Sequence, residues 1–220
     1  MVYKLFSNLK NKDKGVTLVE LVVVIFLIAI FSTILIADFP RIQRQFALSR
    51  VSYKLAQDLR RTQDLGLSGV KTLDKNKNQI AVKGYGIYID TATQPIKKYI
   101  IYADIDVDNT KKDTQKYSGD SNFPLCNAEV DIKSDCVIDV IDVSKENSNL
   151  YIKKVKNLTT SATNVSINFT PPNPTINIDG LDTINNQPPD NSRVGIVLGL
   201  TSDGSERTVW INTSGLINVQ

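Results

Sequence analysis

An apolar run near the N-terminus constrains this 220-residue chain more than any other feature. The 17 residues from Leu21 to Ala37 include no charged side chain, and the run reaches 22 residues when counted from Val16. As a helix it would be about 33 Å long at roughly 1.5 Å per residue, enough to cross the hydrocarbon core of a bilayer. We therefore predict a membrane-spanning helical segment over residues 16–37.

Glu20 is the one charged residue inside this run. A carboxylate just inside a membrane span is disfavoured by about 2.5–3.5 kcal/mol, and such acids usually have a partner and a function. Residues 1–14 carry four lysines and one aspartate, so we expect this leader to stay in the cytoplasm while the C-terminal side is exported. Gly15 separates the leader from the apolar run, and Glu20 is the fifth residue after it.

This arrangement resembles the N-terminus of the type IV pilin superfamily, which includes pilus subunits, type II secretion pseudopilins and competence pilins. The resemblance rests on the basic flank, Gly15, the segment Thr17–Leu21 and the apolar run. It implies that a prepilin peptidase cleaves after Gly15 and methylates the new amine of Val16, and that Glu20 serves assembly. The chain departs from the family in two ways. Val16 stands where phenylalanine or methionine is common, and the usual helix-kinking proline is replaced by Pro40 further on.

Two simpler interpretations compete with this one. A removable secretory signal peptide would have an apolar core of about 7–15 residues that ends in small residues of the A-x-A kind. Here the corresponding residues are Leu35, Ile36 and Ala37, so a leucine occupies a position that needs a small residue. A plain signal anchor would accept the leader and the span, but it would give no reason for Gly15 or Glu20.

Composition argues against catalysis and against a general attraction to phosphates. Without the leader, the chain has 22 basic and 22 acidic residues, so it carries no net charge. It has no histidine, no glycine-rich phosphate-binding loop and no G-x-S-x-G motif. We therefore expect no enzyme activity and no cofactor.

Two smaller features fall in the expected exported part. Cys126 and Cys136 are predicted to form a structural disulfide, because exported compartments are often oxidising. Asp104, Asp106 and Asp108 alternate as in the start of a calcium loop, but the glycine and the bidentate glutamate of that loop are missing. The alternative is that these acids form the solvent face of a strand.

Beyond Pro40, apolar residues at positions 42, 46, 48, 51, 55 and 59 have the spacing of one amphipathic helical stripe. We expect a helix over residues 16–69, ended by Gly66 or Gly69, and a β-rich domain over residues 70–220. β-branched and aromatic runs predict strands at 85–89, 99–103, 137–143, 150–155, 165–169, 193–200, 207–211 and 216–219. The first two should form a hairpin and the last three a meander, whereas the proline-bracketed residues 171–189 should form a surface loop or an edge.

The predicted fold is therefore α+β, with a long N-terminal helix packed on antiparallel sheet. The resemblance implies a prepilin with its N-terminus in the cytoplasm, held in the cytoplasmic membrane and then assembled into an extracellular or periplasmic pilus or pseudopilus. Its partners would be other pilin subunits, the prepilin peptidase and an inner-membrane assembly platform. The size of the chain and the absence of Lys and Arg from residues 214–220 favour a minor subunit.

The sequence leaves two alternative functions open. One is a competence minor pilin that binds DNA through basic residues, which is less favoured because the C-terminal segment has none. The candidate patch consists of Lys153, Lys154, Lys156, Arg193 and Arg207. The other alternative is an adhesive pilus subunit that uses the proline-bracketed loop.

Overall fold

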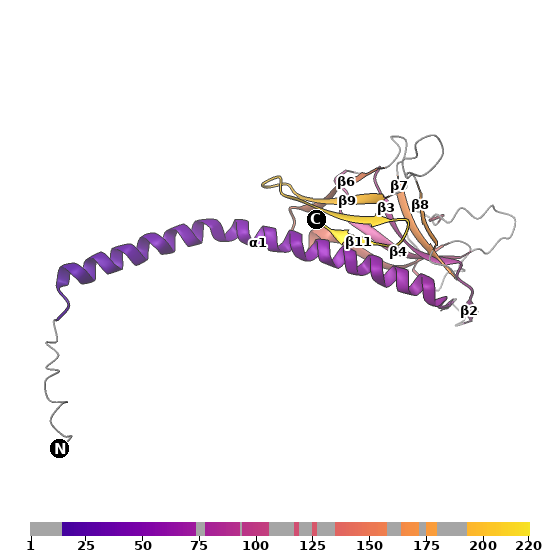
Figure 1. Ribbon diagram of the computed structural model, residues 1–220, viewed down its shortest axis with the longest axis horizontal. Helices are drawn as coiled ribbons and strands as arrows, with labels where there is room; N and C mark the ends of the chain where they lie inside the picture. Colours follow the sequence, from indigo (N-terminus) through magenta and orange to yellow (C-terminus); the bar gives the residue numbers. More distant parts are fainter. Residues whose placement is uncertain are drawn as a thin grey trace, which may run out of the picture. The chain divides into compact units, whose positions relative to one another are not determined.

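The computed structural model describes residues 15–73, 78–92, 94–105, 117–118, 125–126, 135–157, 164–171, 175–179 and 193–220. The chain divides into two compact units, Met1–Gln43 and Arg44–Gln220. Helix α1, Leu18–Ser68, begins in the first unit and ends in the second (Figure 1). The first unit contains no strand among its described residues, and the second contains all the strands described below.

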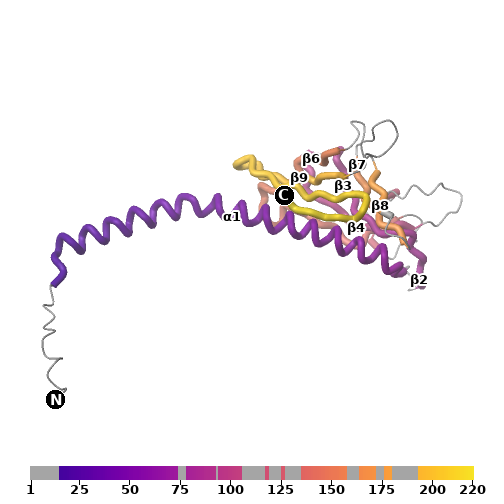
Figure 2. Tube along the Cα trace, viewed as in Figure 1, coloured from indigo at the N-terminus to yellow at the C-terminus, as the bar shows by residue number. Residues whose placement is uncertain are grey.

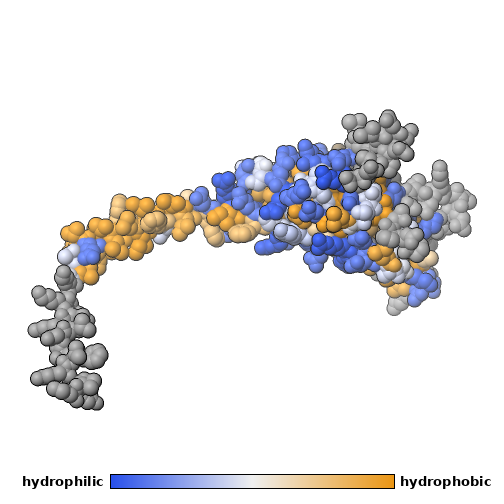
Figure 3. Space-filling model, in the orientation of Figure 1, coloured by the Kyte–Doolittle hydropathy of each residue, from blue (hydrophilic) through white to orange (hydrophobic). Residues whose placement is uncertain are grey.

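The described part of the first unit is an N-terminally capped apolar helix. The hydroxyl oxygen of Thr17 accepts a hydrogen bond from the backbone N–H of Glu20 at 3.3 Å, and its carbonyl accepts one from Leu21 at 3.2 Å. Threonine suits this position because its oxygen satisfies a donor that the first helical turn leaves open. The large apolar side chains of this unit are exposed, and Figure 3 shows an apolar surface along this part of α1. Pro40 lies inside the helix, which continues past it although one backbone donor is lost.

The second half of α1 buries one face in the second unit. Leu48, Val51, Leu55 and Leu59 are at most 3% exposed, as their spacing of three and four residues predicts. The prediction that Ile42 and Phe46 belong to this face is wrong, because Ile42 is 44% exposed and Phe46 is 66% exposed. Residues two apart are about 200° apart around an α-helix, so a helix that buries Leu48 turns Phe46 to the opposite side.

Two glycines near the end of α1, Gly66 and Gly69, are required for different structural reasons. The helix ends at Ser68, and Gly69 follows with φ of 59°, the left-handed conformation that terminates helices. Gly66 is instead a contact residue. A Cβ atom at Gly66 would lie 2.5 Å from the carbonyl oxygen of Phe169, so only glycine lets the helix approach this strand so closely.

The second unit contains two larger antiparallel sheets and one small one. The five-stranded sheet has the order β5-β4-β3-β7-β8 and consists of β3 (Gly84–Asp90), β4 (Lys98–Asp104), β5 (Cys136–Asp142), β7 (Asn164–Thr170) and β8 (Thr175–Ile178). The four-stranded sheet has the order β11-β10-β9-β6 and consists of β6 (Leu150–Lys156), β9 (Arg193–Leu200), β10 (Glu206–Asn212) and β11 (Ile217–Val219). The short strands β1 (Thr72–Leu73) and β2 (Gln79–Ile80) pair with each other, and a 3-10 helix, η1 (Val143–Lys145), follows β5.

The main sequence predictions for the strands are confirmed. Strands β3 and β4 form the expected hairpin, and β9, β10 and β11 form the expected meander, to which β6 adds a fourth strand. Strand β8 lies in the proline-bracketed segment and pairs with β7 at the edge of its sheet. That position suits the segment, because proline lacks the donor that a central strand requires. Strands β1 and β2 form an antiparallel pair within residues 71–83, a segment whose polar composition predicts a connector without strands.

One hydrophobic core joins helix α1 to both larger sheets. It contains Leu55 and Leu59 of α1, Ile167 of the five-stranded sheet, and Ile196 and Ile211 of the four-stranded sheet. Figures 1 and 2 show the second half of α1 running beside the strands, and the side chain of Gln63 on α1 approaches Gly215, which lies just before β11. The fold is therefore α+β, with antiparallel sheets packed on a long N-terminal helix.

Candidate functional site

The segment that precedes α1 is accessible. Residues 15–17 have no regular secondary structure, Val16 is 71% exposed, and no atom lies within 4 Å of the position that a Cβ of Gly15 would occupy. A protease must take an extended, unpaired segment of backbone into its active site. The peptide bond between Gly15 and Val16 lies in a segment without regular secondary structure, just ahead of the helix that begins at Leu18.

Glu20 lies in the first turn of α1 and is exposed. Its backbone N–H is bonded to Thr17, so the position of the residue is fixed relative to the start of the helix. The partial positive charge at a helix N-terminus favours a carboxylate there. This turn therefore presents an acid four residues after Val16 and leaves its carboxylate open to an external cation.

Helix α1 is long and apolar enough to cross a membrane, judged by length and composition. No residue of its most apolar window is buried within the described chain. An apolar helix surface of this extent needs lipid or other helices around it, because water does not solvate it favourably.

Residues 10–36 match the family model of the prokaryotic N-terminal methylation motif. The N-terminal segment is of the kind found in type IV pilins and pseudopilins. Gly15, Val16 and Glu20 all lie inside the matched segment, and the long apolar helix fits the type IV pilin and pseudopilin family. Comparisons with curated proteins and with solved structures found no match. The pilin motif indicates a structural subunit that a prepilin peptidase processes and that assembles with other pilins.

A disulfide joins Cys126 and Cys136 in the second unit of this pilin-type chain. Cys136 is the first residue of β5 and is buried. The backbone N–H of Cys126 donates to the carbonyl of Val137 at 2.8 Å, and Leu125 forms a bridge with Val137. The bond therefore ties residues 125–126 to the start of β5.

The calcium interpretation remains a prediction. Asp104 is the last residue of β4, is 6% exposed, and accepts a hydrogen bond from the side-chain amide of Asn168 at 2.8 Å. It therefore does not lie on a solvent face. Asp106 and Asp108 lie outside the described residues. Within the described ranges, no group of three or more His, Cys, Asp or Glu side chains could hold a metal ion.

A second buried carboxylate lies near Asp104. Asp135 accepts hydrogen bonds from the backbone N–H groups of Ile105 at 2.9 Å and Ser118 at 2.6 Å. Burial raises the pKa of Asp135 above its usual value, although these hydrogen bonds act in the opposite direction. Asp135 directly precedes β5, so its carboxylate links the start of β5 to the end of β4 and to Ser118. This role is structural.

The predicted basic patch is divided between two faces of the four-stranded sheet. Arg207 pairs with Leu198, a core residue, so Arg207 lies on the face that is turned toward α1. Lys156 pairs with Gly195, and Arg193 lies two residues before Gly195 on the opposite face. The patch as predicted from sequence is therefore wrong in its inclusion of Arg207.

Trp210 belongs to this second face and was missed as a candidate surface residue. Its neighbours Val209 and Ile211 are buried in the core, so strand alternation turns Trp210 away from α1. The sequence contained this signal, since a tryptophan between two β-branched residues must face the other way. What could not be deduced is which side chains of β6 and β9 lie beside it.

Proposed function

We propose that this chain is a prepilin that is cleaved between Gly15 and Val16 and methylated on the amine of Val16. Residues 16–37 hold it in the cytoplasmic membrane with residues 1–15 in the cytoplasm, and residues 70–220 are exported. The mature chain is then a structural, minor subunit of a type IV pilus or a pseudopilus. The observation that carries the proposal is the match of residues 10–36 to the N-terminal methylation motif, on a segment that is accessible.

Glu20 is proposed to pair with the methylated Val16 amine of a neighbouring subunit. Two opposite charges that enter an apolar helix bundle together are far less costly than either charge alone. A charge-assisted hydrogen bond between ammonium and carboxylate satisfies both groups. The exposed carboxylate of Glu20, held in the first turn by the Thr17 cap, is positioned for an external partner of this kind.

The apolar helix has two successive environments in this proposal. In the membrane its exposed side chains contact lipid, and in the filament they contact the equivalent helices of other subunits. The polar surface of the second unit, shown in Figure 3, suits the part of the subunit that remains in contact with water. The minor role is supported by the size of the chain and the lack of a basic C-terminal segment.

The test compares two substitutions of Glu20 with a change in the cap. Glu20→Gln keeps a side chain that is compatible with the first helical turn but removes the charge, and Glu20→Ala removes both. Thr17→Ala removes the capping hydroxyl together with one methyl group and leaves Glu20 in place. Incorporation is measured as the amount of protein in sheared filaments relative to the amount in membranes. We expect Glu20→Gln and Glu20→Ala to lower incorporation severely and Thr17→Ala to lower it little.

The opposite pattern would remove the charge-pairing role. If Glu20→Gln enters filaments at the normal level while Thr17→Ala does not, the first turn acts through helix capping and no ion pair is required. If none of the variants and not even the unaltered chain reaches the filament fraction of cells that assemble filaments, the chain is not a filament subunit.

A further inference from the structure

The outer face of the four-stranded sheet, which is turned away from α1, has an uneven distribution of charge. Strands β6, β9, β10 and β11 contain only one acidic residue, Glu206. The outer face also carries four basic residues, Lys153, Lys154, Lys156 and Arg193. Assembly through helix α1 gives this face no role.

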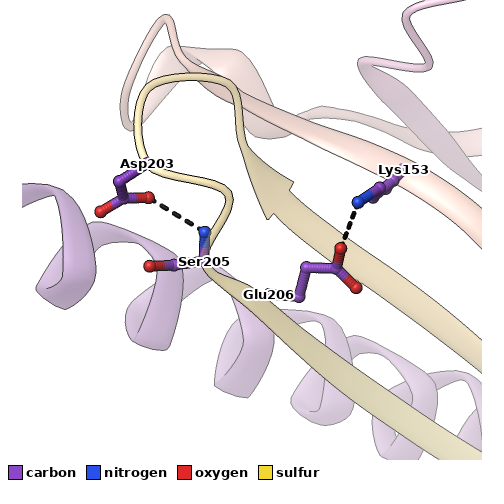
Figure 4. Close-up of polar contacts among 4 residues, drawn as sticks. All are labelled: Lys153, Asp203, Ser205 and Glu206. Atoms are coloured by element: carbon purple, nitrogen blue, oxygen red, sulfur yellow. Dashed lines mark hydrogen bonds and ion pairs between the residues drawn. The ribbon is translucent and has the colours of Figure 1, made fainter.

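The single acid is neutralised by one of the four cations. Lys153 of β6 and Glu206 of β10 form an ion pair across β9, and Figure 4 shows their side chains directed toward each other near the β9–β10 turn. In that turn Asp203 accepts a hydrogen bond from the N–H of Ser205 at 3.0 Å. The hydrogen bond from Lys153 lowers the pKa of Glu206, so this acid is charged at neutral pH.

The other three cations are not neutralised in this way. In the part of the chain that the structure describes, no carboxylate lies within ion-pair distance of Lys154, Lys156 or Arg193. Lys154 is exposed and pairs with Val197 in the middle of β9. Four basic residues less one acidic residue leave an excess of three positive charges on this face, although the chain without its leader is neutral.

Trp210 holds two of these cations close together. A Cβ atom at Gly195 would lie 2.8 Å from Cζ3 of the indole ring, so the ring fills the gap that this glycine leaves. The guanidinium carbon of Arg193 lies 4.3 Å from the ring centroid, and Nζ of Lys156 lies 5.7 Å from it. The indole N–H donates to the side-chain oxygen of Gln220 at 3.1 Å, which fixes the ring. Two cations held beside one rigid ring are suited to a single phosphate group.

Apolar and aromatic side chains accompany the cations. Leu216 is 67% exposed, and alternation with the buried Ile217 turns it to the outer side of the sheet. Tyr151 of β6 is half-buried, and its ring lies 3.6 Å from the position that a Cβ of Gly199 would occupy. Tyrosine and tryptophan are enriched where proteins meet the headgroups of a bilayer.

A short tether keeps this face near a bilayer. The inference rests on the proposed membrane span, which ends at Ala37. Arg44, the first residue of the second unit, is the seventh residue after Ala37, and seven residues reach at most about 25 Å. Headgroups are therefore present at a high effective concentration around the second unit.

We propose that the outer face of the four-stranded sheet binds the anionic headgroups of phospholipids in the membrane that anchors the chain. Arg193 and Lys156 contact headgroup phosphates, Lys154 adds to the attraction, and Leu216 lies among the headgroups. Basic residues next to a membrane are attracted to its negative surface. This contact holds the exported part of the subunit on the bilayer until the subunit is extracted for assembly.

The test uses the full-length protein reconstituted into lipid nanodiscs, with Trp210 as the reporter, because it is the only tryptophan of the chain. One set of nanodiscs contains phosphatidylcholine alone, and the others contain increasing fractions of phosphatidylglycerol. We expect phosphatidylglycerol to shift the emission of Trp210 to shorter wavelengths and to protect it from acrylamide, a neutral quencher. High salt should reverse both changes, because it screens the charges at the membrane surface.

The double variant Lys156→Gln and Arg193→Gln removes two cations and keeps the reporter. Each cation near an anionic membrane contributes about fivefold to binding, so this variant should lower the ratio of docked to undocked protein about 30-fold. Each protein is compared with itself in phosphatidylcholine, since a substitution beside the ring alters its emission. A thermal melt by circular dichroism should show that the variant is folded.

The matched control is the double variant Lys97→Gln and Lys98→Gln. It removes the same charge from exposed positions at the start of β4, outside the four-stranded sheet. Its response to phosphatidylglycerol should equal that of the unaltered protein.

Three results would overturn the proposal: emission that phosphatidylglycerol leaves unchanged, an equal loss of response in the Lys97 and Lys98 control, or the same shift and protection when heparin is added to phosphatidylcholine nanodiscs. The last result would show a general polyanion surface. Incorporation into nanodiscs, measured by co-elution in size exclusion, tests the membrane span separately. A chain that does not incorporate contradicts the proposed span and this inference together, whereas an incorporated chain with unchanged emission contradicts this inference alone.

Discussion

The hydroxyl of Tyr99 donates a hydrogen bond of 2.6 Å to a carboxylate oxygen of Asp58. Tyr99 lies in β4 and is 1% exposed, whereas Asp58 lies on α1 and is half-buried. The bond therefore connects the long helix directly to the five-stranded sheet, across 41 residues of sequence.

Tyr99→Phe is expected to lower the free energy of unfolding by about 1 kcal/mol. A hydrogen bond to a charged group contributes about 1.5–3 kcal/mol, but a half-buried Asp58 recovers part of this by binding water. Urea unfolding of the full-length protein in detergent measures the effect. Tyr53→Phe is the matched control, because Tyr53 is 61% exposed on α1 and should change stability by less than about 0.5 kcal/mol.

Stability should fall above about pH 10, and Tyr99 should contribute to the fall. Burial, and next the hydrogen bond to Asp58, raise the pKa of Tyr99 well above the ordinary value of 10.0. Above pH 10 the unfolded chain therefore loses a proton that the folded chain keeps, so unfolding becomes more favourable as the pH rises. Tyr99→Phe should remove up to about 1.4 kcal/mol per pH unit of this dependence. Parallel stability curves for the two proteins from pH 9 to pH 11 would contradict the assignment.

Gly66→Ala should destabilise the second unit although alanine is the better helix former. The helix would gain about 1 kcal/mol in intrinsic propensity. The new Cβ would, however, meet the carbonyl oxygen of Phe169 at 2.5 Å, and a backbone atom cannot move aside as a flexible side chain can. We expect a net loss of about 1–2 kcal/mol in urea unfolding. Ser68→Ala, at an exposed position in the same helical turn, should be neutral or slightly stabilising.

Reduction of the Cys126–Cys136 disulfide should lower the free energy of unfolding by about 3 kcal/mol. The disulfide closes a short loop, and without it the unfolded chain gains conformational entropy. The measurement is the urea midpoint with and without reductant. The double variant Cys126→Ala and Cys136→Ala should start from the lower stability and show no response to reductant. A midpoint of the unaltered protein that reductant leaves unchanged would mean that the bond does not constrain the unfolded chain.

The long helix and most strands could be predicted because their signals are local. Leu48, Val51, Leu55 and Leu59 have the helical spacing, and the alternation through Val209, Trp210 and Ile211 assigns each residue to a face. Phe46 was misassigned because an apolar residue on a helix was equated with a core residue.

Relationships between distant strands could not be deduced in the same way. The hydrogen bond of Tyr99 to Asp58, the contact of Gly66 with Phe169, and the approach of Lys156 to Trp210 all depend on which strands are neighbours. Sequence patterns specify a strand and its two faces, but not the order of strands in a sheet. The error at Arg207 has a different cause: alternation along β10 already puts Arg207 on the same face as Val209 and Ile211, and the pairing of Arg207 with Leu198 agrees with it.

The central claim is that this chain is a prepilin processed between Gly15 and Val16, and mass spectrometry of the mature N-terminus tests it most directly. The protein is recovered from membranes of cells that contain an active prepilin peptidase, together with a known prepilin as a positive control. The account predicts a chain that begins at Val16 and carries one added methyl group, and a Gly15→Leu variant that keeps residues 1–15. A chain that still begins with the leader, in cells that process the control prepilin, would contradict it.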